Sequence, residues 1–275
     1  MKLRVRERLR IRERLRIRER LSKLQPLGFL YSAYETQVLG QLDRTAFPRH
    51  VAVLADGNRR WARTAAPDMP LVVGYQAGAD KLREFVDWCS DLGIGVVTLW
   101  VLSTDNLTRS SSEEVAPLLR VIENLVTDLS TNYSVQVVGD LNLLPDEMAD
   151  RLRAAEQSKS SGLHVNVAVA YGGRQELRDA FRSLLASEAE KGTSLDDLAE
   201  TLEIDHISEH LYTAGQPDPD LIIRTSGEQR MSGFLIWQSA HSEFYFCEAL
   251  WPDFRKVDFI RALRSYAQRE RRYGR

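Results

Sequence analysis

The sequence contains little cysteine and no long run of apolar residues. Its 275 residues include two cysteines, Cys89 and Cys247, which form no CxxC pair and lack the spacing of metal ligands. This excludes a disulfide framework and a cysteine-based metal centre, and it indicates buried thiols in a reducing cytoplasm. No apolar stretch approaches the roughly 18–20 residues of a spanning helix, and the basic start lacks a signal-peptide pattern. We therefore expect a cytoplasmic protein rather than a membrane-spanning or secreted one.

Several common functional motifs are also absent. No GxGxxG follows the first predicted strand, no GxxxxGK[ST] occurs, and the sequence has no GxSxG nucleophile elbow. These absences exclude dinucleotide binding of the Rossmann type, P-loop nucleotide binding and the serine hydrolase reaction of that elbow.

The net charge of −2 hides an uneven distribution. Residues 1–24 hold eleven Lys and Arg against three Glu, a local charge of +8, so the other 251 residues carry −10. Because nucleic acid binds to basic surfaces, an acidic body argues against a nucleic-acid partner. With 43% apolar and 28% charged residues, the body has the composition of an ordinary globular domain.

The chain divides into three predicted parts: a basic low-complexity arm (1–24), a helical connector (25–47) and one domain (48–275). The arm repeats the hexamer RERLRI. Two interpretations remain open for it: weak peripheral contact with an anionic membrane surface, or an extension without a required role, which we favour.

The domain alternates apolar runs of β type with amphipathic helical stretches. The predicted strands are 50–56, 96–103, 135–139, 164–171, 221–225 and 244–246. The predicted helices are 79–92, 112–131, 145–157, 175–191, 195–202 and 256–269. This alternation predicts an α/β fold, a single domain with a mainly parallel six-stranded sheet and helices on both faces. Functional residues are then expected at the carboxyl ends of the strands.

Polar residues follow three of these strands. The first strand ends in DGNRRW, residues 56–61, a carboxylate followed by a helix start with two arginines. Such a start favours anions, and a carboxylate beside phosphates indicates Mg²⁺. The second strand ends in STDNLTR, residues 103–109, and the fifth in RTSGEQRMS, residues 224–232, which reads as a second anion site. The alternative after the first strand is an ordinary turn with solvated arginines, and after the second it is a capping or turn-forming Asn106 with Arg109 paired to Glu113.

The domain contains, in order, the segments HVAVLADGNRRWA, LSTDNLTR, VNVAVAYGGRQE, DPDLIIRTSGEQRMSGFLIWQSAHSEFYF, LWPDF and RERRYG. On this ordered set, residues 48–274 resemble the cis-prenyltransferases. The resemblance implies a homodimeric, Mg²⁺-dependent enzyme that adds isopentenyl diphosphate to an allylic diphosphate with a cis double bond. A non-catalytic accessory subunit of the same family is the alternative, and the intact aspartate and arginine cluster argue against it.

The resemblance also assigns roles to residues. Asp56 and Asn106 match catalytic positions, and Asp56 and Glu243 match metal ligands, the second of which reaches the partner subunit's site in this family. The matching substrate-binding residues are Gly57, Asn58, Arg59, Arg60, Trp61, Tyr75, Ser103, Thr104, Asp105, Arg109, Arg224, Arg230, Met231, Ser232, Arg272 and Gly274. Tyr75 and Leu71 depart from the family by replacing charged residues.

Product length is expected to depend on bulk in the apolar tunnel behind the polar site. Val101 lies two residues before Ser103, which places both on one strand face, and Phe85 lies on the apolar stripe of the preceding helix. Bulk at Val101 and Phe85 should block a growing chain early. Long-chain members of the family tend to have small residues such as Ala at these two positions, and the segments GYQAGA (74–79) and LSTDNL (102–107) resemble the Z-farnesyl diphosphate synthases more than the long-chain enzymes. The resemblance therefore implies a short product such as Z,E-farnesyl diphosphate from geranyl diphosphate, with a decaprenyl or undecaprenyl synthase as the alternative. A further possibility is that Phe85 only packs the core.

Overall fold

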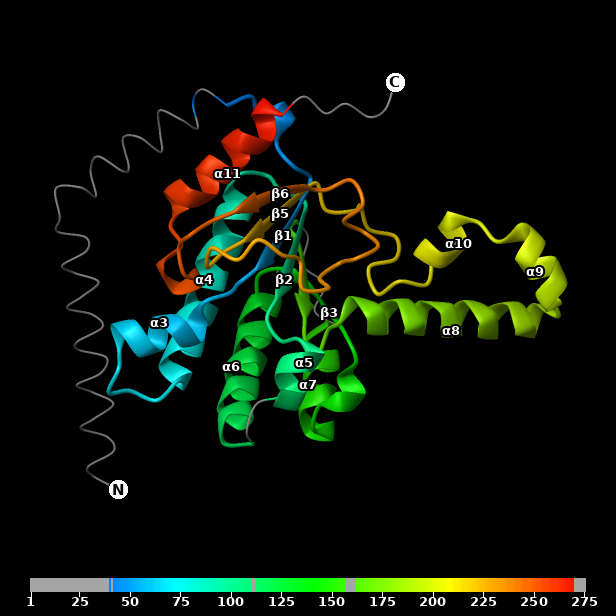
Figure 1. Cartoon of the computed structure of the whole chain (residues 1–275), viewed down its shortest axis with the longest axis horizontal. Coiled ribbons are helices and arrows are strands. Elements are labelled where there is room, and N and C mark those ends of the chain that lie inside the picture. The colour runs from blue at the N-terminus through cyan, green and yellow to red at the C-terminus, as the bar shows by residue number, and fades with distance from the viewer. Residues whose placement is uncertain (1–39, 41, 110–111, 157–161, 270–275) are drawn as a thin grey trace.

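The computed structural model describes residues 40, 42–109, 112–156 and 162–269 as a six-stranded sheet with helices around it (Figure 1). The expected arm (1–24) and most of the connector (25–47) lie outside these residues. Every strand pair is parallel, in the order β3-β4-β2-β1-β5-β6. The strands are β1 His50–Leu54, β2 Val96–Trp100, β3 Ser134–Val138, β4 His164–Ala168, β5 Leu221–Arg224 and β6 Glu243–Phe246. The predicted fold class is confirmed.

The α-helices labelled from α3 onward surround the sheet. They are α3 Asn58–Ala65, α4 Val72–Asp91, α5 Thr104–Arg109, α6 Ser112–Ser130, α7 Asp146–Glu156, α8 Gly173–Lys191, α9 Leu195–Thr201, α10 Ile204–Ser208 and α11 Lys256–Gln268. Three 3-10 turns are η1 Arg44–Ala46, η2 Leu141–Leu143 and η3 Trp251–Asp253. Most helix boundaries agree with the prediction within two residues. Helix α4, however, begins at Val72 rather than 79, and the short α5 and α10 were not predicted.

Strands β2 and β4 are shorter than predicted. The backbone amides of Val101 and Leu102 both donate to Ala168 O, at 3.1 and 3.2 Å, so the regular ladder stops there. The segments that follow β2 and β4 pair once more, at an isolated parallel bridge between Ser103 and Tyr171. This irregular stretch is part of the wall of the site described below.

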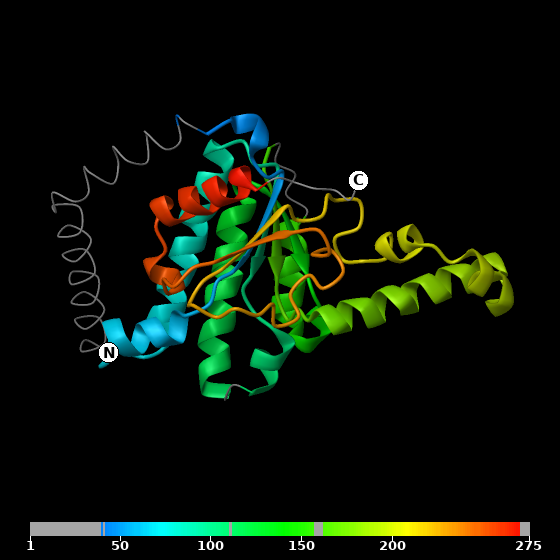
Figure 2. The same cartoon turned by 45° about the horizontal axis from the view of Figure 1, so that its top comes forward.

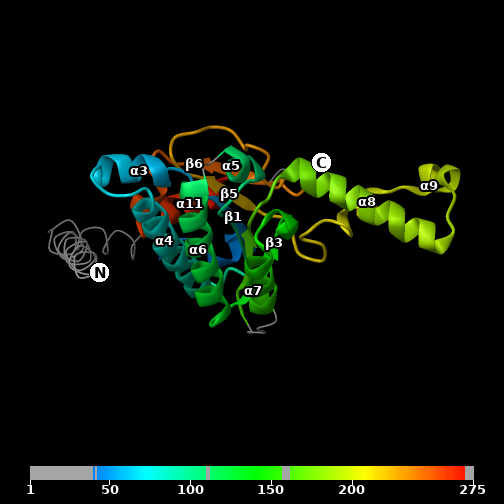
Figure 3. The ribbon, with the colours of Figure 1, turned by 90° about the horizontal axis from the view of Figure 1, so that it is seen from below.

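The two faces of the sheet are covered differently. On one face, α4, α6, α7 and α11 enclose the larger apolar core; Figure 3 shows α4 and α6 side by side along the sheet. On the other face, residues from the 211–242 segment, among them Phe234 and Leu235, pack on a smaller core. Helix α8 touches this face through its first turns and then extends away from the body with α9 and α10 (Figures 1 and 2). None of the helices that the structure describes is long and apolar enough to cross a membrane.

Candidate active site

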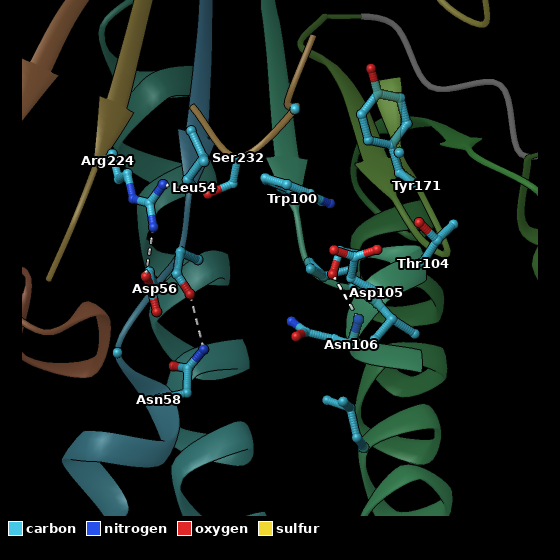
Figure 4. Close-up of a pocket in the computed structure, with 18 of the residues that line it drawn as sticks. Leu54, Asp56, Asn58, Trp100, Thr104, Asp105, Asn106, Tyr171, Arg224 and Ser232 are labelled. Carbon is cyan, nitrogen blue, oxygen red and sulfur yellow. Dashed lines mark hydrogen bonds and ion pairs between the residues drawn. The ribbon is translucent and has the colours of Figure 1, made fainter. Parts of the chain in front are cut away.

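A cavity of about 1260 Å³ opens at the carboxyl ends of the strands. Its walls come from the segments after β1, β2, β4 and β5, from α3, and from the N-terminus of α8. Figure 4 shows side chains from these segments converging: Asp56 and Arg224 on one side, Asp105 and Asn106 on the other. Small-molecule sites usually measure about 300–1,000 Å³, so this cavity has room for two ligands together.

Asp56 follows β1 and faces the polar part of the cavity. Its Oδ2 accepts a hydrogen bond from Arg224 Nη2 at 3.1 Å, and Arg60 Nη2 lies 3.9 Å from the same oxygen. The Asp56 side chain remains 41% exposed, whereas that of Arg224 is 5% exposed. The Thr225 hydroxyl donates to Asp56 O at 2.8 Å and holds the local backbone. Asp56 therefore presents a solvent-accessible carboxylate from a fixed position.

Helix α3 begins directly after this carboxylate. Its N-cap, Gly57, has φ 109°, a left-handed conformation that favours glycine, and it supplies no side-chain cap. The first-turn N–H groups can therefore face an anion. Asn58 is wedged against α4, where a Cβ on Gly78 would lie 2.2 Å from Asn58 Oδ1. Asn58 Nδ2 donates to Ala55 O at 3.0 Å. The small Gly78 thus lets α4 approach the start of α3.

The opposite side of the polar cavity is built by the residues after β2. Ser103 Oγ accepts the backbone N–H of Asn106 at 3.0 Å and begins α5. Thr104, Asp105 and Asn106 line the cavity from this short helix. Thr104 N donates to Tyr171 O at 3.1 Å, which fixes α5 against the segment after β4. Thr104, Asp105 and Asn106, predicted site residues of this segment, therefore lie across the cavity from Asp56 (Figure 4).

The segment after β5 curls back over Arg224. Arg224 Nη1 donates to Ser232 Oγ at 2.8 Å and also to Arg230 O. Arg230 forms an ion pair with Glu228, and both line the cavity. The buried Arg224 therefore links Asp56 to Ser232, and it joins the two segments predicted to bind anions, which are about 170 residues apart in sequence.

Arginine is in excess around the cavity. The lining residues include six arginines against three carboxylates, Asp56, Asp105 and Glu228. Arg59, Arg63 and Arg174 form no ion pair with any residue that the structure describes. Burial raises the pKa of the half-buried Tyr75 hydroxyl, and the charges of Arg59 and Arg63 oppose this rise. The site is built for ligands that carry several negative charges.

An apolar compartment continues the cavity between α4 and α6. Ala79 and Leu82 line it from α4, and Val101 lines it from the segment after β2. Helix α6 contributes the remaining wall: Leu118, Val121, Ile122 and Leu125. A polar mouth with an apolar compartment suits an amphiphilic ligand that has an anionic head and a hydrocarbon tail.

The expectation that Phe85 faces this compartment is wrong. Phe85 is fully buried and is not among the lining residues. Its ring centroid lies 4.8 Å from that of Phe259 and 5.7 Å from that of Trp251, within an aromatic cluster of the main core. Leu82, one turn earlier on α4, faces the cavity in its place. Phe85 thus packs the core, the alternative stated above.

The other predicted residues fall into three groups. Gly57, Asn58, Arg59, Arg60 and Tyr75 line the cavity as expected. Trp61 and Met231 are half-buried but are not among the lining residues. The Arg109 side chain, Arg272 and Gly274 lie outside the described part of the chain.

Glu243 does not lie in the cavity of its own chain. It pairs with Leu221 at the amino ends of β5 and β6, whereas Arg224 at the carboxyl end of β5 reaches Asp56. Its carboxylate forms an ion pair with Arg269. Within the described residues, no group of three or more His, Cys, Asp and Glu side chains could hold a metal.

Sequence reasoning missed several lining residues. Arg63 lies one turn after Arg59 on α3, so helical periodicity could have placed it on the same face. Glu228 lies within the segment 224–232, and its position two residues before Arg230 could have indicated an ion pair with that arginine. Arg174 and Gln175 follow β4, whose carboxyl end the general rule for parallel sheets already marked as a place for functional residues.

Comparisons with known proteins agree with this geometry. Residues 54–274 match the family described as "Putative undecaprenyl diphosphate synthase". A (2Z,6E)-farnesyl diphosphate synthase from Thermobifida fusca is 56% identical over 248 residues, which cover 89% of this chain and 97% of that protein. An isoprenyl transferase 1 from Streptomyces avermitilis is 54% identical over 245 residues, which cover 88% of this chain and 94% of that protein.

A solved structure shows the same architecture. Lavandulyl diphosphate synthase from Lavandula x intermedia, in complex with dimethylallyl diphosphate, is 34% identical, with a TM-score of 0.74. The match covers 82% of this chain and 98% of that one. Together with the family match over residues 54–274 and the relatives above half identity, this shows that the chain belongs to the cis-prenyltransferase family of undecaprenyl diphosphate synthase.

Proposed function

We propose that this chain is a short-chain Z-prenyl diphosphate synthase that condenses isopentenyl diphosphate with geranyl diphosphate to (2Z,6E)-farnesyl diphosphate. The observation that carries the proposal is the cavity itself: an arginine-rich mouth around Asp56 opens into an apolar compartment between α4 and α6. Two relatives, at 56% and 53% identity, are (2Z,6E)-farnesyl diphosphate synthases, and they support the short product.

The donor set fits Mg²⁺ held mainly by substrate. Asp56 offers an accessible carboxylate beside a helix N-terminus and several arginines, and Mg²⁺ is commonly bound by one or two carboxylates together with substrate phosphates. When bound there, Mg²⁺ would neutralise charge on a diphosphate. Asp56 would hold the ion, and the first-turn N–H groups of α3 would hold the phosphate oxygens.

The arginines can then stabilise the leaving group. In the condensation, the bond between the allylic C1 and its diphosphate oxygen breaks, and the isopentenyl double bond forms a new carbon–carbon bond to C1. A proton leaves the added unit, which gives the new double bond. Negative charge develops on the departing diphosphate, and pre-positioned cations such as Arg59 and Arg60 stabilise that charge. In this proposal Arg224, Arg230 and Ser232 bind the isopentenyl diphosphate, and Asn106 faces the reacting centre.

The activity test uses radiolabelled isopentenyl diphosphate with geranyl or farnesyl diphosphate and Mg²⁺. We expect a fifteen-carbon product from geranyl diphosphate, and loss of activity on chelation with restoration by added Mg²⁺. A ladder of long products would favour a polyprenyl synthase instead. No product with any allylic substrate would favour the accessory-subunit alternative.

Chain length is tested at the apolar compartment. Val101 lines the cavity, whereas Phe85 on α4 does not. Replacing each bulky side chain with alanine therefore compares a cavity position with a core position. We expect Val101→Ala to lengthen the product by one or more five-carbon units. Phe85→Ala should lower stability but leave the product length unchanged. A longer product from Phe85→Ala alone would contradict this assignment.

The proposal includes a homodimer. Glu243 lies away from the cavity of its own chain, so it could serve as a metal ligand only toward another subunit. Helix α8 extends from the body and exposes Phe181 and Leu185, at 41% and 47%, on one face. Mixing inactive Asp56→Ala and Arg272→Ala chains should recover activity if sites are shared. Proven subunit exchange without recovery would argue against sharing.

A further inference from the structure

Helix α8 carries a buried carboxylate that the reaction described above does not use. Glu176 is 1% exposed and accepts hydrogen bonds from three separate segments. Tyr171 Oη donates to its Oε2 at 2.5 Å, and Tyr212 N and Gln238 Nε2 donate to its Oε1 at 3.1 and 3.0 Å. Burying a carboxylate is costly unless such donors satisfy it, so this arrangement fixes the relative position of all three segments.

Two of the three donors connect Glu176 to the segment 231–238, which contains Ser232. The Tyr171 hydroxyl also accepts the backbone N–H of Leu235 at 3.2 Å. Gln238 is itself part of that segment, and its Nε2 also donates to Thr213 Oγ1 at 3.0 Å. Glu176 is therefore connected to the segment both directly and through Tyr171. The structure contains no contact between Glu176 and the cavity, whose wall includes Tyr171 instead.

The connected segment has a backbone that needs external support. Ser232 and Leu235 have φ of 52° and 46°, in the left-handed region that residues with a Cβ rarely adopt. Phe234 stacks on Trp100 with ring centroids 5.0 Å apart, and Gly233 O accepts the N–H of Gly173 at 3.0 Å. These contacts hold a conformation that the segment would not prefer alone.

We propose that Glu176 is a positioning residue for isopentenyl diphosphate binding. Through Tyr171 and Gln238 it holds the 231–238 segment in place, so that Ser232 within the segment and Arg230 just before it contact the diphosphate. This inference rests on the proposed function, in which these two residues bind that substrate. Arg224 contributes the second attachment, because its Nη1 bonds to both Arg230 O and Ser232 Oγ. The segment is thus held at its start by Arg224 and at its end by Glu176.

The sharpest test removes one oxygen atom. Tyr171→Phe keeps the ring, which packs edge-on against Trp100 and Phe234, and Figure 4 shows the hydroxyl pointing away from Asp56 and Asn106. The change removes the acceptor of the Leu235 N–H and one donor to Glu176. We expect the KM for isopentenyl diphosphate to rise about tenfold, while the KM for geranyl diphosphate stays within about twofold.

A second variant tests the carboxylate directly. Glu176→Gln replaces one acceptor oxygen with an NH₂ group. On the Oε1 side that group would face the N–H donors of Tyr212 and Gln238, and on the Oε2 side it would turn the Tyr171 hydroxyl from a donor into an acceptor. The same selective rise in KM is therefore expected, of about tenfold or less. Asp179→Asn is the matched control on the same helix: Asp179 accepts the Tyr212 hydroxyl at 2.6 Å and has no bond to the 231–238 segment. This control should leave both KM values unchanged.

Amide hydrogen exchange reports the anchoring without relying on activity. Peptides that cover residues 231–238 should exchange faster in Tyr171→Phe and Glu176→Gln than in wild type or Asp179→Asn. Unchanged exchange there, or equal changes in both KM values, would overturn the inference.

Arg230→Ala separates this inference from the proposed function. If Arg230→Ala raises the KM for isopentenyl diphosphate and the Tyr171 and Glu176 variants do not, only the positioning role is wrong. If Arg230→Ala leaves that KM unchanged, the proposed substrate site itself is wrong, and the positioning role falls with it.

Discussion

The two ends of the sheet hold two polar clusters of opposite character. At the carboxyl end, the cavity around Asp56 gathers charged side chains with arginine in excess and leaves several of them solvent-accessible. At the amino end, the uncharged side chains of Thr98, Asn166 and the half-buried Gln216 surround His50, and the buried carboxylate of Asp220 accepts the backbone N–H of His50 at 3.1 Å. Both clusters interrupt an apolar sheet, so polarity alone does not distinguish a ligand site from a structural network.

The amino-end network satisfies its members internally. His50 bonds through Nδ1 to Pro217 O at 2.7 Å and through Nε2 to Thr98 Oγ1 at 2.8 Å. Asn166 Nδ2 donates to Thr98 Oγ1 at 3.1 Å and to Gln216 Oε1 at 2.6 Å. In the cavity, by contrast, Arg59, Arg63 and Arg174 have no ion-pair partner among the described residues. The amino-end network is thus largely closed on itself, whereas these exposed cavity arginines remain available to an anionic ligand in the proposed function.

The largest effect is expected at the carboxyl end of the sheet, on removal of the charge of Asp56. Asp56→Asn keeps the size of the side chain and removes the charge that would hold Mg²⁺. Because electrostatic stabilisation dominates in such sites, kcat should fall by about 10³-fold, measured with isopentenyl and geranyl diphosphates at saturating Mg²⁺.

Asp150→Asn is the matched control, since Asp150 is an exposed partner of Arg153 far from the cavity. It should leave kcat unchanged. An Asp56→Asn enzyme with more than about a tenth of wild-type kcat would contradict the assigned role of Asp56.

The second prediction concerns the amino-end network and pH. Burial lowers the pKa of His50 from 6.5 to about 4. Between these values the unfolded chain binds a proton that the folded chain does not, so stability falls as the pH decreases from 6.5 towards 4. The full contribution, about 3 kcal/mol, is present above pH 6.5.

Chemical denaturation of wild type and His50→Gln across this pH range measures the effect. The variant should lose the His50 part of the slope, and its KM values at pH 7.5 should stay within about twofold of wild type, since the network lies away from the cavity. An unchanged slope in His50→Gln would sink the prediction.

The smallest effect is expected on removal of a single exposed arginine charge at the cavity, that of Arg63. Arg63 is exposed and lines the cavity near Tyr75. Solvent and salt therefore partly screen the attraction between its charge and a bound diphosphate. Arg63→Gln should raise the KM for geranyl diphosphate about threefold at low salt and less at high salt.

Arg264→Gln, an exposed arginine on α11 that does not line the cavity, is the control. A salt-independent change in KM for Arg63→Gln, or an equal change for Arg264→Gln, would show that the loss is not electrostatic at this site.

Much of the fold was predictable because buried parallel strands have a strong sequence signature. The runs at 50–54 (HVAVL) and 96–100 (VVTLW) each hold four apolar residues out of five, and the long helices α6 and α8 repeat apolar residues with helical spacing. The ends of β2 and β4 were not predictable. They depend on Ala168 O accepting two amides from a strand about seventy residues away. Helix α5 is too short for periodicity to reveal it.

The candidate site was predictable where the chemistry lies within one segment. Asp56, Asn58 and Arg60 adjoin one strand end, and Arg224 to Ser232 another, so a single topological rule places both at one edge. The resemblance to the cis-prenyltransferases is confirmed. Phe85 was assigned to the wrong surroundings because a helical stripe shows which face is buried but not which neighbours meet each turn.

The sequence by itself determined the elements, the edge of the sheet that carries the chemistry, and the excess of arginine there. These properties depend on local pattern and on residue type. Only the tertiary structure decided which bulky side chains border the cavity. The rings of Trp251 and Phe259, far away in sequence, surround Phe85 and leave Leu82 and Val101 at the apolar wall. It also decided that Glu176 is connected to the Ser232 segment, because that connection is a set of three hydrogen bonds among segments that meet only in the folded chain.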